Sequence, residues 1–202
     1  MIKSIDKKKK EMKKVENDVI NLKKSPLYKY RVENGYMPVI GQGSYNAKIL
    51  FIGEAPGKKE AQTGIPFCGA SGKFLDELLA HINLPREKVY IANVLKDRPQ
   101  ENRDPKPDEI ELYAPFLDRQ IEIIKPKIIA TLGRFSMDYI MKRYGLGDKI
   151  TKISDIHGQV FKTKGPSGDV IIVPLYHPAV AIYNANNKGK LKKDFEILKG
   201  LV

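Results

Sequence analysis

Four short apolar segments alternate with longer helical patterns along most of the chain. The apolar segments are rich in β-branched residues and span Ile49–Ile52, Val89–Val94, Ile128–Leu132 and Val170–Leu175. Between and after them, apolar residues recur at helical spacing over Gly72–Ile82, Pro107–Ile124 and Phe135–Tyr144. Nearly continuous apolar strands that alternate with helices are typical of a parallel sheet covered on both faces. The pattern therefore predicts a three-layer α/β/α sandwich with a central four-stranded parallel sheet.

The first part of the chain has a different pattern. Its apolar residues recur at helical spacing, at Met12, Val15, Val19 and Leu22. This spacing predicts an amphipathic helix over about residues 5–24. We therefore divide the chain into a lysine-rich N-terminal helix or tail, residues 1–24, and an α/β domain, residues 25–202.

The segments that follow the four predicted strands carry the candidate functional residues. In parallel sheets of this kind, ligands bind beyond the carboxyl ends of the strands. The loops at that edge bring together polar, aromatic and basic side chains, namely Glu54, Phe67, Asn93, Arg98, Arg103, Arg134 and His177. Because several such side chains share one edge, the sequence favours a binding or catalytic site there.

The charge of the chain indicates the kind of partner. The 202 residues carry a net charge of +12 with a pI near 9.5, and 42% of them are hydrophobic, which suits one domain with a full core. Residues 1–24 hold a net +5 and residues 186–199 a net +3. Such a chain favours polyanions, nucleic acid first. A lysine-rich surface is also typical of proteins from thermophiles, so charge alone leaves both readings open.

Several classes of protein are disfavoured by the composition. No apolar stretch approaches the length of a membrane span, and the lysine-rich start lacks the apolar core of a signal peptide. We therefore expect a cytoplasmic protein that makes no membrane contact. Cys68 is the single cysteine, which excludes disulfides within the chain and a cysteine-built metal site. We expect His81 and His157 to be structural.

One glycine-rich segment, GEAPGKKEAQTGIPFCGASG at residues 53–72, connects the first predicted strand to a helix. Its backbone freedom suits either a long connection or a pocket for a flat polar group beside a phosphate. Gly69, Ser71 and Gly72 lead into the helix, whose free N–H groups are suited to bind a phosphate. Ser71 is also a candidate helix cap.

Five motifs occur together in the order GEAPG, PFCG, ANVLKDRP, NRDP and YHPA. In this order and at these intervals they resemble the uracil-DNA glycosylase superfamily, above all the family-four enzymes of thermophilic bacteria and archaea. The resemblance covers about residues 21–187. It implies the α/β fold predicted above and the removal of uracil from DNA by hydrolysis of the N-glycosidic bond, which leaves an abasic site. Such a reaction needs no metal.

The resemblance also implies roles for individual residues. Phe67 resembles the aromatic residue that stacks on uracil, Asn93 the amide that reads the pyrimidine edge, and His177 the histidine that faces the uracil O2. Glu54 and Glu60 match the acidic positions of the first motif. A side-chain amide has a donor and an acceptor, which match the N3–H and C4 carbonyl of uracil.

The residue that activates water is less clear from the sequence. The best-studied branch of the superfamily carries an aspartate where this chain has Ala55, which we assign only to the uracil pocket. Glu54 and Glu60 are the two candidates for positioning water or stabilising the sugar cation. His177 is the candidate donor for the negative charge that grows on the departing base.

Contacts to DNA are expected around this pocket. We assign them to Gly69, Ser71, Gly72, Arg98, Arg134, Ala179 and Lys188. Residues Ala179–Tyr183 are candidates for a wedge that fills the stack after a nucleotide is flipped out.

A cofactor implied by the resemblance is not matched by the residues. Family-four enzymes typically hold an iron–sulfur cluster with four cysteines, whose positions here are Leu22, Ser25, Asp97 and Tyr113. Cluster iron needs thiolates or occasional histidines. We predict that the cluster is absent, that Leu22 and Tyr113 make an apolar contact, and that Ser25 and Asp97 form hydrogen bonds or caps.

The sequence thus favours a monofunctional uracil-DNA glycosylase of base-excision repair. Its expected partner is DNA that contains uracil, its expected state is a monomer, and any repair clamp that it binds stays unknown. Two alternatives remain open. One is a non-catalytic binder of uracil-containing or single-stranded DNA, and the other is a glycosylase with a broader range of deaminated bases.

Overall fold

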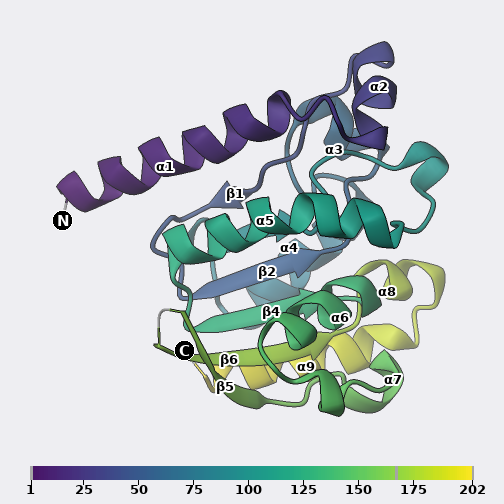
Figure 1. Ribbon diagram of the computed structural model, residues 1–202. Coiled ribbons are helices and arrows are strands. Elements are labelled where there is room, and N and C mark those ends of the chain that lie inside the picture. Colours follow the sequence, from purple (N-terminus) through teal and green to yellow (C-terminus); the bar gives the residue numbers. More distant parts are fainter. Residues whose placement is uncertain (1, 167, 202) are drawn as a thin grey trace.

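The computed structural model, which describes residues 2–166 and 168–201, is built around one sheet with the strand order β1-β3-β2-β4-β6-β5 (Figure 1). The four central strands are parallel, as predicted. In sheet order they are β3 (Tyr90–Asn93), β2 (Ile49–Gly53), β4 (Ile128–Leu132) and β6 (Gly168–Leu175). Their residues are almost all buried, which explains why these strands appear in the sequence as apolar runs.

Two antiparallel edge strands extend the predicted sheet. The two-residue strand β1 (Gln42–Gly43) pairs with β3, and β5 (Phe161–Gly165) pairs with β6. Neither strand gives an apolar run, because β1 is too short and β5 alternates half-buried residues with exposed Lys162 and Lys164. The predicted four-stranded parallel sheet is therefore the centre of a larger mixed sheet.

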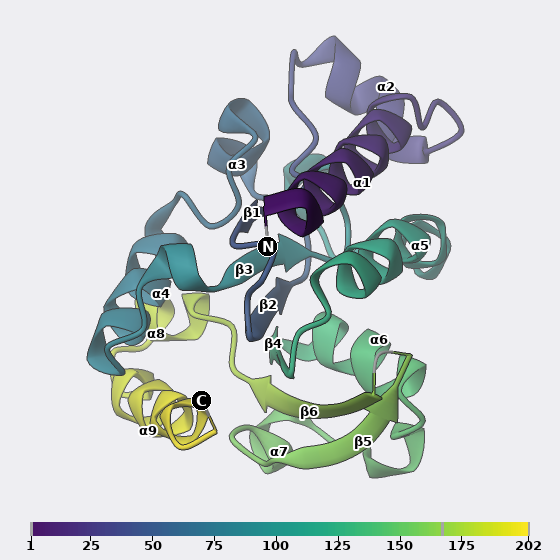
Figure 2. The same cartoon turned by 90° about the vertical axis from the view of Figure 1, so that its left-hand side faces the viewer.

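Helices cover both faces of the sheet, which confirms the three-layer architecture (Figure 2). One face carries α1 (Ile2–Ile20), α5 (Pro107–Ile124) and α6 (Arg134–Arg143), and the other carries α4 (Ala70–His81) and α9 (Asn187–Lys199). The shorter helices are α2 (Pro26–Glu33), α3 (Lys58–Thr63), α7 (Ile153–Ile156) and α8 (Ala179–Tyr183). Each face has its own apolar core. No helix in the described ranges has both the length and the apolar character needed to cross a membrane.

The lysine-rich helix α1 packs along α5 with its apolar side buried (Figure 1). Met12, Val15 and Val19 are at most 4% exposed and belong to the same core as α5 and α6. The expected helix is thus present, although it begins earlier and ends earlier than the pattern suggested. The division between residues 1–24 and 25–202 stays a prediction.

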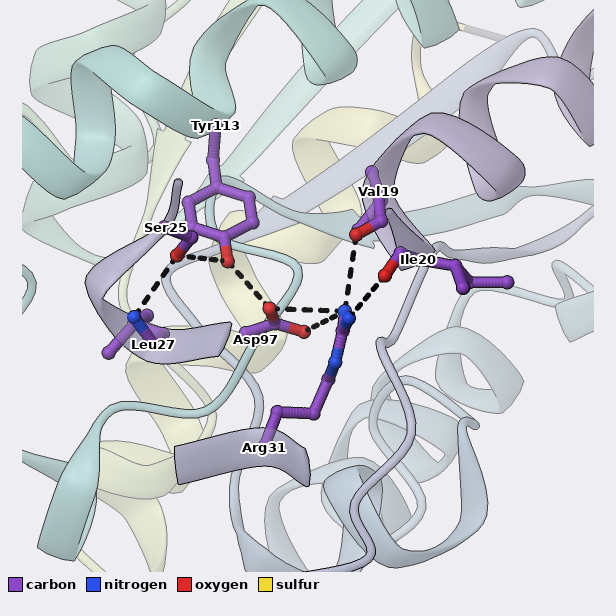
Figure 3. A network of polar contacts seen from close by, with 7 residues as sticks. All are labelled: Val19, Ile20, Ser25, Leu27, Arg31, Asp97 and Tyr113. Carbon is purple, nitrogen blue, oxygen red and sulfur yellow. Dashed lines mark hydrogen bonds and ion pairs between the residues drawn. The ribbon is translucent and has the colours of Figure 1, made fainter. Parts of the chain in front are cut away.

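A buried ion pair fixes the end of α1 (Figure 3). Arg31 of α2 donates from Nη1 to both carboxylate oxygens of Asp97, at 3.1 and 3.2 Å. The same guanidinium donates to the carbonyls of Val19 and Ile20, at 3.2 and 2.5 Å. The last carbonyls of a helix lack partners within the helix, so Arg31 satisfies them and joins α1 to the segment after β3.

Tyr113 of α5 completes this network (Figure 3). Its hydroxyl donates to Asp97 at 2.6 Å and lies 2.7 Å from Ser25 Oγ, which caps α2 by accepting from Leu27 N at 3.1 Å. Leu22 and Tyr113 share one apolar core. The hydrogen bonds of Ser25 and Asp97, and the cap that Ser25 forms, are thus as the sequence predicts, whereas a direct apolar contact between Leu22 and Tyr113 stays a prediction.

We expect Tyr113→Phe to lower the free energy of unfolding by about 1–3 kcal/mol, because it removes the hydrogen bonds that the Tyr113 hydroxyl makes with the buried Asp97 and Ser25. Urea unfolding followed by circular dichroism measures this loss. The matched control is Tyr139→Phe, which removes one partly buried hydrogen bond to Asp118. An equal loss in the two variants would show that the network adds nothing to an ordinary tyrosine contact.

Candidate active site

The carboxyl ends of β2 and β3 form the floor of the candidate site. The two strands stay paired beyond the sheet, because Val94 N donates to Gly53 O and Leu95 N donates to Glu54 O, each at 3.0 Å. A Cβ atom on Gly53 would collide with Asn93 Oδ1 and would lie 2.8 Å from the Phe67 ring. The structure therefore brings Asn93 and Phe67 together over a position where only glycine fits.

Asn93 lies at the bottom of this site with an unused donor. The residue is 1% exposed, and its amide nitrogen Nδ2 has no hydrogen-bond partner within residues 2–166 and 168–201. The Asn93 amide lies close enough to the Glu60 carboxylate to lower the pKa of Glu60. Its Nδ2 is nevertheless not in hydrogen-bond geometry with that carboxylate. A buried donor without a partner costs about 1–3 kcal/mol, so this nitrogen is a candidate contact for a ligand carbonyl.

Phe67 is held in an unusual backbone conformation. Its φ of 48° lies in the left-handed region, which costs on the order of 1–3 kcal/mol for a residue other than glycine. Two neighbours accommodate this conformation. Glu60 accepts a hydrogen bond from the Phe67 N–H, and Gly72 has no Cβ atom, which leaves room for the Phe67 carbonyl. The ring is buried, and its centroid lies 5.6 Å from that of His177.

Glu60 acts on this loop through both of its oxygens. One oxygen accepts from Phe67 N and the other from Gly57 N at 2.6 Å. Burial raises the pKa of Glu60, and the two backbone N–H groups oppose this shift. Because both oxygens are occupied, Glu60 positions Phe67, and this arrangement favours Glu54 as the carboxylate that meets water.

Glu54 directly follows β2 and is partly buried at the rim of the site. Burial raises the pKa of Glu54 to about 7, the negative charge of Asp104 adds to the shift, and Arg134 opposes it. Arg134 and Asp104 form an exposed ion pair with each other. Asp104 lies in the NRDP motif, but no local signal in the sequence indicates that its charge acts on Glu54. A carboxyl group with a near-neutral pKa is suited to acid–base chemistry.

His177 follows β6 and presents a defined face to the site. Its Nδ1 accepts from the N–H of Ala179 at 3.1 Å, so the neutral ring carries its proton on Nε2. Burial lowers the pKa of His177 to about 4. The imidazole is therefore a neutral donor near pH 7.

Two of the predicted basic residues have other partners. Arg98 is 8% exposed and donates to the Tyr30 hydroxyl and to Asn102 Oδ1, at 2.8 Å each. Arg103 donates to both carboxylate oxygens of Glu109, at 2.5 and 2.8 Å. Both guanidinium groups thus hold the loop after β3. Of Arg98, Arg103 and Arg134, only Arg134 has a side chain that is mostly exposed at this edge of the sheet.

The expected phosphate loop leads into α4. Gly69 occupies the helix cap position and Ser71 lies inside the first turn, so the alternative role of Ser71 as a plain cap is wrong. Gly69 has no side chain that could cap the first N–H groups of α4. Ala55 is partly buried against the apolar core beneath the site. Exposed Lys188 lies with its Nζ 5.8 Å from the centre of the Phe74 ring.

Helix α8 forms an apolar projection beside His177. Tyr183 is 89% exposed and Ile182 is 49% exposed. These are the two large apolar side chains that the expected wedge segment turns outward. The two remaining histidines make contacts away from the pocket, since His81 pairs with Glu196 and His157 with Asp194.

The residues do not fit an iron–sulfur cluster. Within residues 2–166 and 168–201, no group of three or more His, Cys, Asp or Glu side chains could hold a metal ion. The oxygens of Ser25, Asp97 and Tyr113 are occupied by one another and by Arg31. Cys68 lies in a different loop, 3.3 Å from the hydroxyl of Thr63.

Comparisons with known proteins agree with this geometry. The sequence model of the Uracil DNA glycosylase superfamily matches residues 40–199. A type-4 uracil-DNA glycosylase of Sulfurisphaera tokodaii is 42% identical over 94% of this chain and 84% of its own length, and one of Archaeoglobus fulgidus is 41% identical over 89% and 87%. A DNA polymerase of Bacillus phage SP01 is 31% identical over 82% of this chain, which corresponds to 17% of the polymerase. Since the family match spans most of the sequence and includes every element around the site, the chain belongs to the uracil-DNA glycosylase superfamily.

Proposed function

We propose that this protein removes uracil from DNA by hydrolysing the N-glycosidic bond, which leaves an abasic site. The observation that carries the proposal is that Asn93 and Phe67 meet at Gly53 with His177 beside the Phe67 ring, while the buried Nδ2 of Asn93 has no partner among the described residues. A pyrimidine with a C4 carbonyl supplies the missing acceptor. The similarity to type-4 uracil-DNA glycosylases over most of the chain supports the same activity.

Recognition of the base follows from the donor and acceptor of one amide. Asn93 Nδ2 donates to the C4 carbonyl of uracil, and Oδ1 accepts from its N3–H. Cytosine presents an amine and an acceptor at the same positions, so it leaves buried polar groups mismatched, and such mismatches are penalised strongly. Phe67 covers the face of the ring and offsets part of the cost of unstacking the nucleotide.

Bond cleavage leaves negative charge on the base and positive character on the sugar. The neutral His177 donates from Nε2–H to the uracil O2, where the negative charge grows. Glu54 in its carboxylate form positions the attacking water or stabilises the oxocarbenium-like sugar. No step of this reaction needs a metal or a Schiff-base lysine.

DNA is bound around the rim of the pocket. The N–H groups at the start of α4, from Gly69 to Gly72, receive a phosphate beside the flipped nucleotide, because the first N–H groups of a helix have no partner within the helix. Arg134 and Lys188 supply positive charge on either side. Tyr183 at the tip of α8 is the side chain that enters the vacated stack, because it is the most exposed large apolar residue of the described chain.

The runner-up functions differ in chemistry and in substrate range. A non-catalytic protein would bind uracil-containing DNA and leave the glycosidic bond intact. A broader glycosylase would also excise other deaminated bases. We favour an enzyme over a binder because burial raises the pKa of Glu54 toward neutrality and His177 carries a donor on Nε2. We favour uracil over other bases because the Asn93 amide matches its N3–H and C4 carbonyl. Action as a monomer without lyase activity, and the cytoplasmic location, stay predictions.

We expect the protein to convert a labelled uracil-containing oligonucleotide to a product that alkali cleaves at the uracil position. Matched oligonucleotides with cytosine, thymine or hypoxanthine define the base range. His177→Ala should lower the single-turnover rate by about 10²-fold, the scale of one lost oxyanion donor. DNA affinity should change little, because phosphate contacts dominate it. Binding without cleavage by the parent protein would favour the non-catalytic alternative.

We expect the rate of excision to fall below about pH 7, because protonation removes the Glu54 carboxylate whose pKa is about 7. Asp104→Asn removes a neighbouring negative charge, so it should lower the pKa of Glu54 and move the acid limb to lower pH. Glu54→Gln should be slow and should lack this limb. Single-turnover rates from pH 5 to 9 test both expectations, and an unchanged acid limb in Glu54→Gln would exclude Glu54 as its source.

We also propose that this protein works without an iron–sulfur cluster, since the residues at the four ligand positions do not supply thiolates. Protein purified without oxygen should contain no stoichiometric iron or sulfide and should show no brown absorbance near 400 nm. Uracil excision should survive incubation with a strong iron chelator. Stoichiometric iron, or activity that depends on added metal, would overturn the proposal.

A further inference from the structure

Lys96 is a fully buried lysine without an acidic partner. It follows Asn93 by three residues, its exposed fraction is 0%, and no carboxylate in the described part of the chain forms an ion pair with it. Lysine is almost never fully buried unless it is paired, because burial of an unpaired charge is costly. An apolar residue would fill the same space at lower cost, so the contacts of its amine indicate what it does.

The amine binds two carbonyl oxygens from different elements. Lys96 Nζ donates to the backbone carbonyl of Asn93 at 2.7 Å and to Gln120 Oε1 of α5 at 2.5 Å. Gln120 is itself fixed, because its amide nitrogen donates to Ile40 O at 2.8 Å. The end of β3 is thereby tied to the middle of α5.

The position of the Asn93 carbonyl explains why this bond is needed. Val94 N, in the same peptide group, donates to Gly53 O on β2, so the Asn93 carbonyl points away from β2. The strand on that side is β1, but it pairs only with Ile91 and Tyr90 and does not reach Asn93. Lys96 therefore takes the place of a neighbouring strand at the residue that carries the site amide.

We propose that Lys96 is a positioning residue for base recognition, which holds the Asn93–Val94 peptide from the side opposite Gly53 and so aims the Asn93 amide at the base. The inference rests on the role of Asn93 proposed above. Burial lowers the pKa of Lys96 to about 7. The neutral amine still has two N–H groups for its two acceptors, so the bonds persist in either protonation state.

A double-mutant cycle tests whether Lys96 acts through Asn93. Lys96→Met should slow single-turnover excision of uracil by up to about 10²-fold, the scale of a 1 Å misplacement in a site. In an Asn93→Ala background the same substitution should change the rate less than about twofold, because coupled residues are not additive. Additive losses would overturn the role of Lys96. Full activity of Asn93→Ala alone would instead overturn the proposed role of Asn93.

Two further variants separate positioning from stability. Lys8 is the matched control, because its amine also donates to backbone carbonyls, those of Tyr45 and Ile124, at 3.0 and 3.3 Å. Lys8→Met should lower thermal stability but leave the excision rate of the folded protein unchanged. Lys96→Gln keeps an N–H donor and should recover part of the rate, and it replaces Lys96→Met in the cycle if that variant does not fold.

Inhibition by free uracil gives an independent measurement. Lys96→Met should raise the uracil concentration that inhibits excision by about tenfold or more, while affinity for abasic DNA stays unchanged, because phosphate contacts dominate that affinity. An unchanged response to uracil in a folded, slow variant would show that Lys96 affects the reaction by another route.

Discussion

No side chain can stand at residue 53, because Asn93 Oδ1 and the Phe67 ring occupy the space where a Cβ would be. The ends of β2 and β3 are held together by the bonds from Val94 N to Gly53 O and from Leu95 N to Glu54 O. The Asn93 amide and the Phe67 ring can therefore both lie over the bare Cα of Gly53. Phe67 reaches this position with a left-handed φ, which Glu60 and the start of α4 stabilise. The Asn93 carbonyl lies beyond the end of the short strand β1, and Lys96 binds it there.

The sequence predicts the central sheet and the main pocket residues because those features have local signals. The limits of β4 and α5 agree with the apolar runs, and Phe67, Asn93 and His177 lie in recognisable motifs. The sequence gives no comparable signal for contacts between distant segments. Lys96 lies in a motif yet its partner Gln120 is 24 residues away, so nothing local distinguishes it from a surface lysine. The same holds for the charge of Asp104 near Glu54 and for the two edge strands.

The hydrogen bonds among Ser25, Arg31, Asp97 and Tyr113 join segments that are distant in the sequence, as a covalent cross-link would. Arg31 and Ser25 belong to α2 and its cap, Tyr113 to α5 and Asp97 to the loop after β3, and each makes contacts with at least one other. A buried ion pair of this kind adds stability only if its remaining donors and acceptors are satisfied. Here the helix carbonyls of Val19 and Ile20 and the hydroxyls of Ser25 and Tyr113 meet that condition. The arrangement is directional, so it specifies how α1 and α2 meet the sheet.

The two edge strands also affect how copies of this protein meet in solution. An exposed edge strand carries unpaired N–H and C=O groups and can serve as a template for strands of other molecules. The outer edge of β5 carries Lys162 and Lys164, whose like charges repel a second copy of the same edge. At the opposite edge, β1 offers only two residues for pairing. Both ends of the sheet are thus protected against edge-to-edge aggregation, which matters for a basic protein that becomes concentrated along a polyanion.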